Sequence, residues 1–145
     1  MHRLDGDPGA SNVAEVTVKA LADQINAPGG CNEGFLRDDA LLVVVAIQDT
    51  FDSFSEGEPE DWAAALEDAK GGDEEAVVLL VISTDIDDPF SLCGYEPSDE
   101  HELRTWTELM QPNALFGSAC ATDYVSFFET AAAMIKSQCD VFVPQ

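Results

Sequence analysis

Asp49 is the first side chain in this sequence whose position points to chemistry, because it follows an uninterrupted apolar run at residues 41–47. A run of this length, rich in Val and without polar alternation, is typical of a parallel strand that is buried on both faces. Open α/β sheets bind ligands beyond the carboxyl ends of such strands. Oxygen-rich turns suit hard cations such as Mg²⁺ or Ca²⁺, which makes Asp49 a candidate metal ligand.

A second apolar run, residues 77–82, also ends in an acidic turn, which contains Asp85 and Asp87. This spacing resembles the D-x-D pair of phosphatases of the haloacid dehalogenase type, in which one carboxylate attacks and the other handles the proton. Pro89 stands where that motif needs Thr or Val, and no Lys follows at a suitable place. Motifs of other hydrolases and nucleotide-binding enzymes are absent. We therefore predict no enzyme, with a small Mg-dependent phosphatase-like hydrolase as the alternative.

The four cysteines are too far apart in the sequence for a C-x-x-C metal or redox motif. Their even number fits two disulfides and an oxidising compartment, although free buried thiols are also compatible with the spacing. Cys120 and Cys139 flank a predicted helix, so we expect them to pair, which leaves Cys31 with Cys93.

The elements that position these residues alternate between strands and helices. Residues 1–10 are predicted to be irregular, and residues 11–145 to form a single domain of about three strands and four helices in the order α-β-α-β-α-β-α. Such alternation predicts an α/β, Rossmann-like parallel sheet with helices on both faces. The predicted helices cover residues 13–26, 59–69, 98–110 and 123–138, and the strands residues 41–47, 77–82 and 114–119. Asn12 and Glu15 predict a capping box at the first helix, and Ser98 an N-cap for the third.

The charge balance restricts the possible partners. The chain has 29 acidic and six basic residues, a formal net charge of −23. Nucleic acids and anionic membrane surfaces need Lys and Arg, so neither is expected as a partner. No apolar run reaches the roughly 18 residues needed to span a bilayer, and the first residues do not form a secretory signal.

Several separated stretches resemble the second half of von Willebrand factor A (VWA) domains. These are residues 32–52, the Ala69-Lys-Gly-Gly that precedes the second strand, and residues 117–139. The similarity covers roughly residues 11–145. It is greatest to the version in secreted and lipid-anchored proteins of Gram-negative bacteria such as myxobacteria, which implies a secreted, periplasmic or outer-surface location.

The resemblance implies a metal-ion-dependent adhesion site with ligands from three loops. Asp49 matches the aspartate of the third loop, and Asp52 matches an additional acid of the bacterial version. The D-x-S-x-S of the first loop and a convincing second-loop Thr are absent, and Gln48 replaces the Thr of the third loop. We therefore expect weak Mg²⁺ or Ca²⁺ binding, or none, in this chain alone.

In the family the strand at residues 41–47 is central, so without the first half it would be an exposed apolar edge. We expect this edge to be covered by a protein partner, by the missing amino-terminal half, by a second copy in a homodimer, or by the first helix. The predicted function is a non-catalytic binding or adhesion module with a strongly acidic surface. Besides the hydrolase, an acidic structural α/β domain without a ligand is the remaining alternative.

Overall fold

The computed structural model describes residues 11–50, 52–84 and 102–143 of the chain. Its centre is a parallel sheet of three strands: β1 (Leu42–Ile47), β2 (Val77–Ser83) and β3 (Ala114–Ser118). The strands lie in the order β1-β2-β3, with Leu42 opposite Val77 and Leu79 opposite Ala114. The predicted parallel α/β sheet is thus confirmed.

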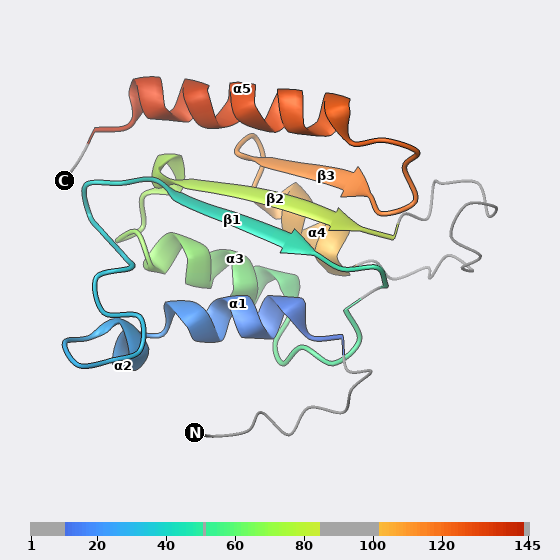
Figure 1. Cartoon of the computed structure of the whole chain (residues 1–145). Helices are drawn as coiled ribbons and strands as arrows, with labels where there is room; N and C mark the ends of the chain where they lie inside the picture. The colour runs from blue at the N-terminus through green and yellow to red at the C-terminus, as the bar shows by residue number, and fades with distance from the viewer. Residues whose placement is uncertain (1–10, 51, 85–101, 144–145) are drawn as a thin grey trace.

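Helices cover both faces of this sheet (Figure 1). α5 lies along one face, and α1, α3 and α4 form the layer on the other. The elements with helical structure are α1 (Val13–Leu21), α2 (Asp23–Asn26), α3 (Pro59–Asp68), a 3₁₀ turn η1 (Glu74–Ala76), α4 (Glu102–Leu109) and α5 (Val125–Val141). The residues that precede α4, including Ser98, Asp85 and Asp87, lie outside the described part of the chain.

The first predicted helix is wrong in one respect, because it consists of two helices. α1 ends at Ala22, whose ψ of 136° is not helical, and the short α2 follows. Asn26 and Asn32 explain this break, since both side-chain amides donate to the carbonyl of Ala20, at 2.9 and 3.0 Å. These hydrogen bonds satisfy a carbonyl that a continuous helix would bond internally.

The core on the α1 side of the sheet is built around two tryptophans. The rings of Trp62 in α3 and Trp106 in α4 meet edge to face, with centroids 5.8 Å apart. Both are buried, together with Leu66, Leu79 and Leu103. The apolar spacing of α3 and α4 thus joins these helices to each other and to β2.

The core on the α5 side is smaller. Val78 and Leu80 of β2 pack there with Ala131, the one described residue of α5 that is fully buried. Phe127 lies against Gly117 of β3, where an added Cβ would be only 2.6 Å from the ring. The glycine therefore sets how closely α5 approaches the sheet.

β1 is not buried on both faces, contrary to the sequence prediction. Its even-numbered side chains Leu42 and Ala46 are buried toward α1, but Val45 and Ile47 are 50% and 63% exposed on the α5 side. All seven residues of β2 are buried, so β2 and not β1 is the central strand. Among the described strands, β1 forms an edge of the sheet and carries exposed apolar side chains, as expected.

Candidate functional site

Asp49 and Asp52 both lie just beyond the carboxyl end of β1, as predicted, but in different environments. Asp49 is exposed to solvent. Asp52 is buried, with 4% of its surface exposed. The loop that carries them is fastened to β2, because Ser83 Oγ donates to the carbonyl of Thr50 at 3.0 Å. The Gln48 side-chain amide donates to the same carbonyl at 3.1 Å.

The Asp52 carboxylate accepts hydrogen bonds from three described donors. Its Oδ2 accepts from the backbone N–H of Ala14 at 2.9 Å and from Ser55 Oγ at 2.8 Å. Its Oδ1 accepts from the backbone N–H of Ser55 at 3.1 Å. Ala14 is in the first turn of α1, where free N–H groups and the positive end of the helix dipole attract an anion. Asp52 therefore caps α1 from 38 residues away.

The predicted capping box at α1 is wrong. The side chain of Asn12 makes no capping hydrogen bond, and Glu15 pairs instead with Lys19. The N–H of Glu15 donates to Ser55 Oγ at 2.9 Å, so the loop after β1 supplies both caps of this helix. A distant partner replaced the local one because the packed loop offers a buried acceptor that solvent does not compete for.

This geometry does not fit a divalent cation at Asp52. Three of the roughly four lone-pair positions of this carboxylate already accept hydrogen bonds, and only 4% of the residue's surface is exposed, so little of Asp52 is left for a metal. Within the described ranges, no group of three or more His, Cys, Asp and Glu side chains is arranged to hold a metal ion. Of the two predicted ligands, Asp49 is the one with an exposed carboxylate. Its role as a metal ligand stays a prediction.

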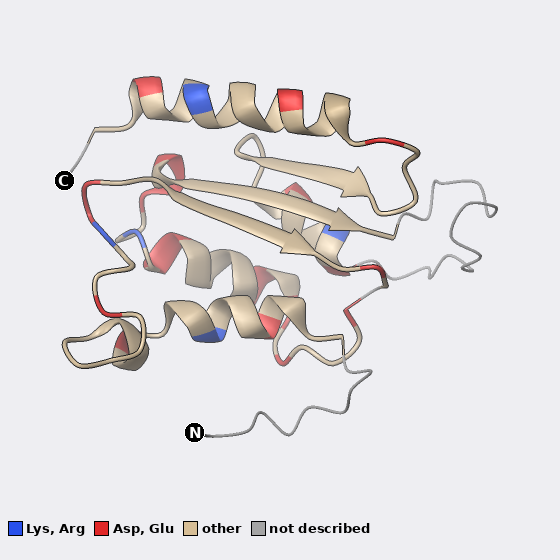
Figure 2. Ribbon diagram, viewed as in Figure 1, with Lys and Arg blue, Asp and Glu red and all other residues tan. Residues whose placement is uncertain are grey.

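The described acidic residues lie in the loops and helices, while the three strands contain no charged residue (Figure 2). Eighteen of the 29 acids fall between Asp52 and Glu108, with Lys70 and Arg104 as the only Lys or Arg in that stretch. The acids of this stretch that the structure describes lie outside the strands, in the loops and helices that flank the sheet.

The predicted disulfide pairing is wrong. Cys31 and Cys139 are free and exposed, whereas Cys120 is disulfide-bonded to a partner outside the described residues. Cys139 lies 14 residues into α5, about 21 Å along the helix from Val125. Cys120 precedes the start of that helix, and disulfides need Cα atoms within about 7 Å. A long helix between two cysteines thus separates them.

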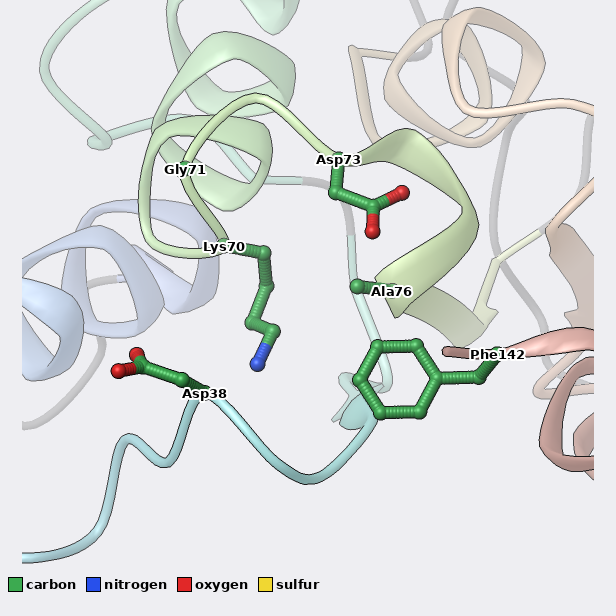
Figure 3. Close-up of a pocket in the computed structure, with 6 residues that line it drawn as sticks. All are labelled: Asp38, Lys70, Gly71, Asp73, Ala76 and Phe142. Carbon is green, nitrogen blue, oxygen red and sulfur yellow. The ribbon is translucent and has the colours of Figure 1, made fainter. Parts of the chain in front are cut away.

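A shallow pocket lies at the amino-terminal ends of β1 and β2, opposite the end that carries Asp49 (Figure 3). It encloses about 160 Å³ and is lined by Asp38, Lys70, Gly71, Asp73, Ala76 and Phe142. Lys70 points between the carboxylate-bearing side chains and toward the aromatic ring.

The Lys70 ammonium joins the end of α3 to the segment before β1. It donates to the carbonyls of Arg37 and Ala40, at 2.6 and 2.8 Å, and lies 5.7 Å from the centroid of the Phe142 ring. Two of its three donors are thus used within the chain. We interpret this pocket as a structural junction rather than a ligand site.

The open edge of β1 is the second candidate site. The N–H of Gln48 donates to the carbonyl of Ile82 at 2.9 Å, so the backbone groups of even-numbered residues point toward β2. Backbone direction alternates along a strand of a parallel ladder. The N–H and C=O groups of Val43, Val45 and Ile47 therefore point away from β2, where no described strand pairs with them.

Phe128 extends the apolar surface of this edge onto α5. Phe128 and Ile135 are seven residues apart and share one flank of α5, and the C-cap Phe142 follows Ile135 at the same spacing. The Phe142 ring lies beside the Lys70 ammonium, which donates to the carbonyl of Ala40 just before β1, so this flank is directed toward β1. Phe128 is 50% exposed and lies at the end of α5 that is near the carboxyl ends of the strands.

The sequence prediction missed Ser55 and Lys70. Ser55 gives no detectable signal, because its role depends on Glu15 of α1, which lies 40 residues earlier. Lys70 offers a weak one, since Lys70 and Arg104 are the only Lys or Arg among the eighteen acids from Asp52 to Glu108.

Comparison of the chain with protein-family models found no match. No curated protein and no solved structure matches it significantly either. None of the helices in the described part of the chain combines the length and apolar composition needed to cross a membrane.

Proposed function

We propose that this chain is a non-catalytic protein-binding module that works by strand addition, with a partner strand continuing the sheet at the open edge of β1. The observation that carries the proposal is the exposure of Val45 and Ile47, at 50% and 63%, on an edge strand of purely apolar sequence. An exposed, apolar edge is a ready template for another strand.

The expected alternative in which the first helix covers this edge is not supported. α1 packs against β1 and α3 on one face of the sheet. It leaves the outward backbone groups of Val43, Val45 and Ile47 without a described partner. Because water is displaced and hydrogen bonds are formed together, adding a strand here would gain both backbone pairing and apolar burial.

The proposal agrees with the resemblance to the second half of VWA domains, in which the equivalent strand is central. Under this interpretation Asp49 belongs to an incomplete metal-ion-dependent adhesion site, and protein binding by the isolated chain does not depend on a metal. An extracytoplasmic location follows from the same resemblance and is part of the proposal.

Selection of a phage-displayed random-peptide library against the chain tests strand addition. We expect enriched peptides to bind wild type and to lose binding to Val45→Pro. That substitution removes an N–H that points away from β2, and proline is tolerated on edge strands. Ile47→Lys, at a side chain that is 63% exposed, is a second variant that blocks the edge without altering the core.

Phe35→Lys provides the matched control, because Phe35 is 60% exposed in the loop before β1. Peptides should bind this variant as they bind wild type. Failure to enrich any peptide, or enriched peptides that bind Val45→Pro and Ile47→Lys unchanged, would contradict strand addition at β1.

A further inference from the structure

We propose that the partner of the β1 edge is a single strand of a different polypeptide segment, apolar on both of its faces and carrying Lys or Arg at the end that lies beside Asp49. This inference rests on the proposed strand addition and identifies the chemistry of the partner. Three features support it: the position of α1, the surfaces on the two sides of the edge, and the distribution of charge along β1.

The position of α1 and the net charge argue against a second copy of this chain as the partner. α1 packs beneath β1, on the face opposite α5. Pairing two β1 strands antiparallel about a two-fold axis would place the strands about 4.8 Å apart and crowd the two α1 helices on one face of the joined sheet. It would also bring together two chains that each carry a formal net charge of −23. Packed helices need an axis separation of about 8–10 Å. A partner strand that brings no helix of its own on this side avoids this crowding.

The surfaces that a new strand would meet are apolar or neutral on both faces of the sheet. On the α5 side they are Val45, Ile47 and Phe128, each at least half exposed. A strand placed there would extend the existing cluster of Val43 and Ile135.

On the opposite side the new strand would meet a flank of α1. One flank of α1 is directed toward α3. Its residues Val18, Leu21 and Ala22 line a groove together with Ala65 and Ala69. Val13, Thr17 and Ala20 lie on the other flank and are half-buried. Strands that are covered on both faces are apolar throughout rather than alternating, which defines the expected partner sequence.

Charge differs between the two ends of β1. Near the amino end, Arg37 and Lys70 accompany the acids, and Arg37 Nε lies 3.1 Å from Asp39 Oδ1. The loop after β1, residues 48–58, carries four acids and neither Lys nor Arg. Asp52 in this loop is already hydrogen-bonded, whereas Asp49 is exposed. A basic residue in the partner would therefore be attracted most strongly at a position beside Asp49.

Two fluorescent peptides test this inference: Lys-Thr-Val-Ile-Val-Ile-Val-Lys and the same peptide with Glu at both ends. Fluorescence anisotropy should show that the lysine peptide binds the full chain and that Val45→Pro abolishes binding. Asp49→Asn should weaken binding of the lysine peptide by about threefold to fivefold, as expected for one partly exposed ion pair. Asp39→Asn, at the opposite end of the strand, should have no effect and serves as the matched control.

The outcomes separate this inference from the proposed function. Equal binding of both peptides, with no effect of Asp49→Asn, would overturn the basic partner but leave strand addition intact. Binding of neither peptide, or binding unaffected by Val45→Pro, would overturn both proposals.

Sedimentation velocity tests the exclusion of a second copy. We expect a monomer at all concentrations in 0.15 M salt, where charges are screened beyond about 8 Å. A dimer that Val45→Pro dissociates would overturn the inference of a different polypeptide, while supporting strand addition itself.

Discussion

The carboxylate of Asp52 accepts a hydrogen bond of 2.9 Å from the backbone N–H of Ala14, which fixes the loop after β1 to the first turn of α1. The same loop is held again by Ser53 and Phe54, whose N–H groups donate to the carbonyl of Ser11 at 3.2 and 3.0 Å. The carboxylate of Asp52, which the sequence suggested as a metal ligand, is therefore hydrogen-bonded within the chain and stabilises the fold.

Asp52→Ala is expected to lower the free energy of unfolding by about 1–3 kcal/mol, because it leaves donors of α1 and Ser55 without their buried acceptor. Urea denaturation followed by circular dichroism measures this change. Asp49→Ala, in the same loop but exposed, should stay within about 0.5 kcal/mol of wild type. Equal effects of the two substitutions would argue against a capping role for Asp52.

The two core tryptophans should respond differently to substitution by Phe. Trp62 Nε1 donates to the carbonyl of Glu56 at 2.9 Å, whereas Trp106 Nε1 is buried without a hydrogen-bond partner among the described residues. Both substitutions leave a similar cavity, but only Trp62→Phe breaks a hydrogen bond. We expect Trp62→Phe to cost about 1 kcal/mol more than Trp106→Phe in urea denaturation. The reverse order would contradict this interpretation of the core.

Gly117→Ala should loosen α5, because the new Cβ would lie 2.6 Å from the Phe127 ring. We expect a loss of about 1–3 kcal/mol of stability, typical of overpacking. The double variant Gly117→Ala with Phe127→Leu should recover part of that loss, since the smaller side chain makes room. A double variant that is as unstable as the sum of the two single ones would show that the contact is unimportant.

Two thiols should be reactive in the folded protein. Cys31 and Cys139 are free and exposed, so iodoacetamide should alkylate both under native, non-reducing conditions, and intact-mass spectrometry should show two additions. Cys139→Ser should reduce the number to one without changing stability. Absence of labelling at Cys139 would revive the pairing with Cys120 that the sequence favoured.

Mg²⁺ and Ca²⁺ should bind weakly or not at all. Titration calorimetry with millimolar concentrations of either ion is expected to show no saturable binding, since a single exposed carboxylate supplies few of the oxygen ligands these ions need. Saturable binding that disappears in Asp49→Asn would contradict this and would restore a metal site at the end of β1.

The sequence predicted the strands accurately because their apolar runs are long and contiguous. The observed β2, Val77–Ser83, is one residue longer than the predicted run, and β1 lacks one predicted residue. The predicted helix bounds were less exact where side chains from outside the helix determine its end. Asn32, which captures the carbonyl of Ala20, could not be foreseen to end α1.

The candidate site was only partly predictable for a related reason. The position of Asp49 and Asp52 at the carboxyl end of β1 follows from local sequence, but the burial of Asp52 depends on α1, 38 residues earlier. Likewise, the apolar run in β1 indicates a buried strand. The open edge was expected only from the resemblance to half of a VWA domain, and the order of the described strands shows it. Tertiary partners decide both cases, and no local pattern encodes them.

Amide hydrogen exchange along β1, measured by NMR, tests strand addition most directly. In the isolated chain, the outward N–H groups of Val45 and Ile47 should exchange at least about a hundredfold faster than the inward N–H groups of Val44 and Ala46, which pair with β2. Adding the lysine peptide should slow hydrogen exchange at the N–H groups of Val45 and Ile47 to a rate similar to that of Val44 and Ala46. Outward amides that are already protected in the monomer, or that the peptide leaves unprotected, would contradict an open edge that accepts a partner strand.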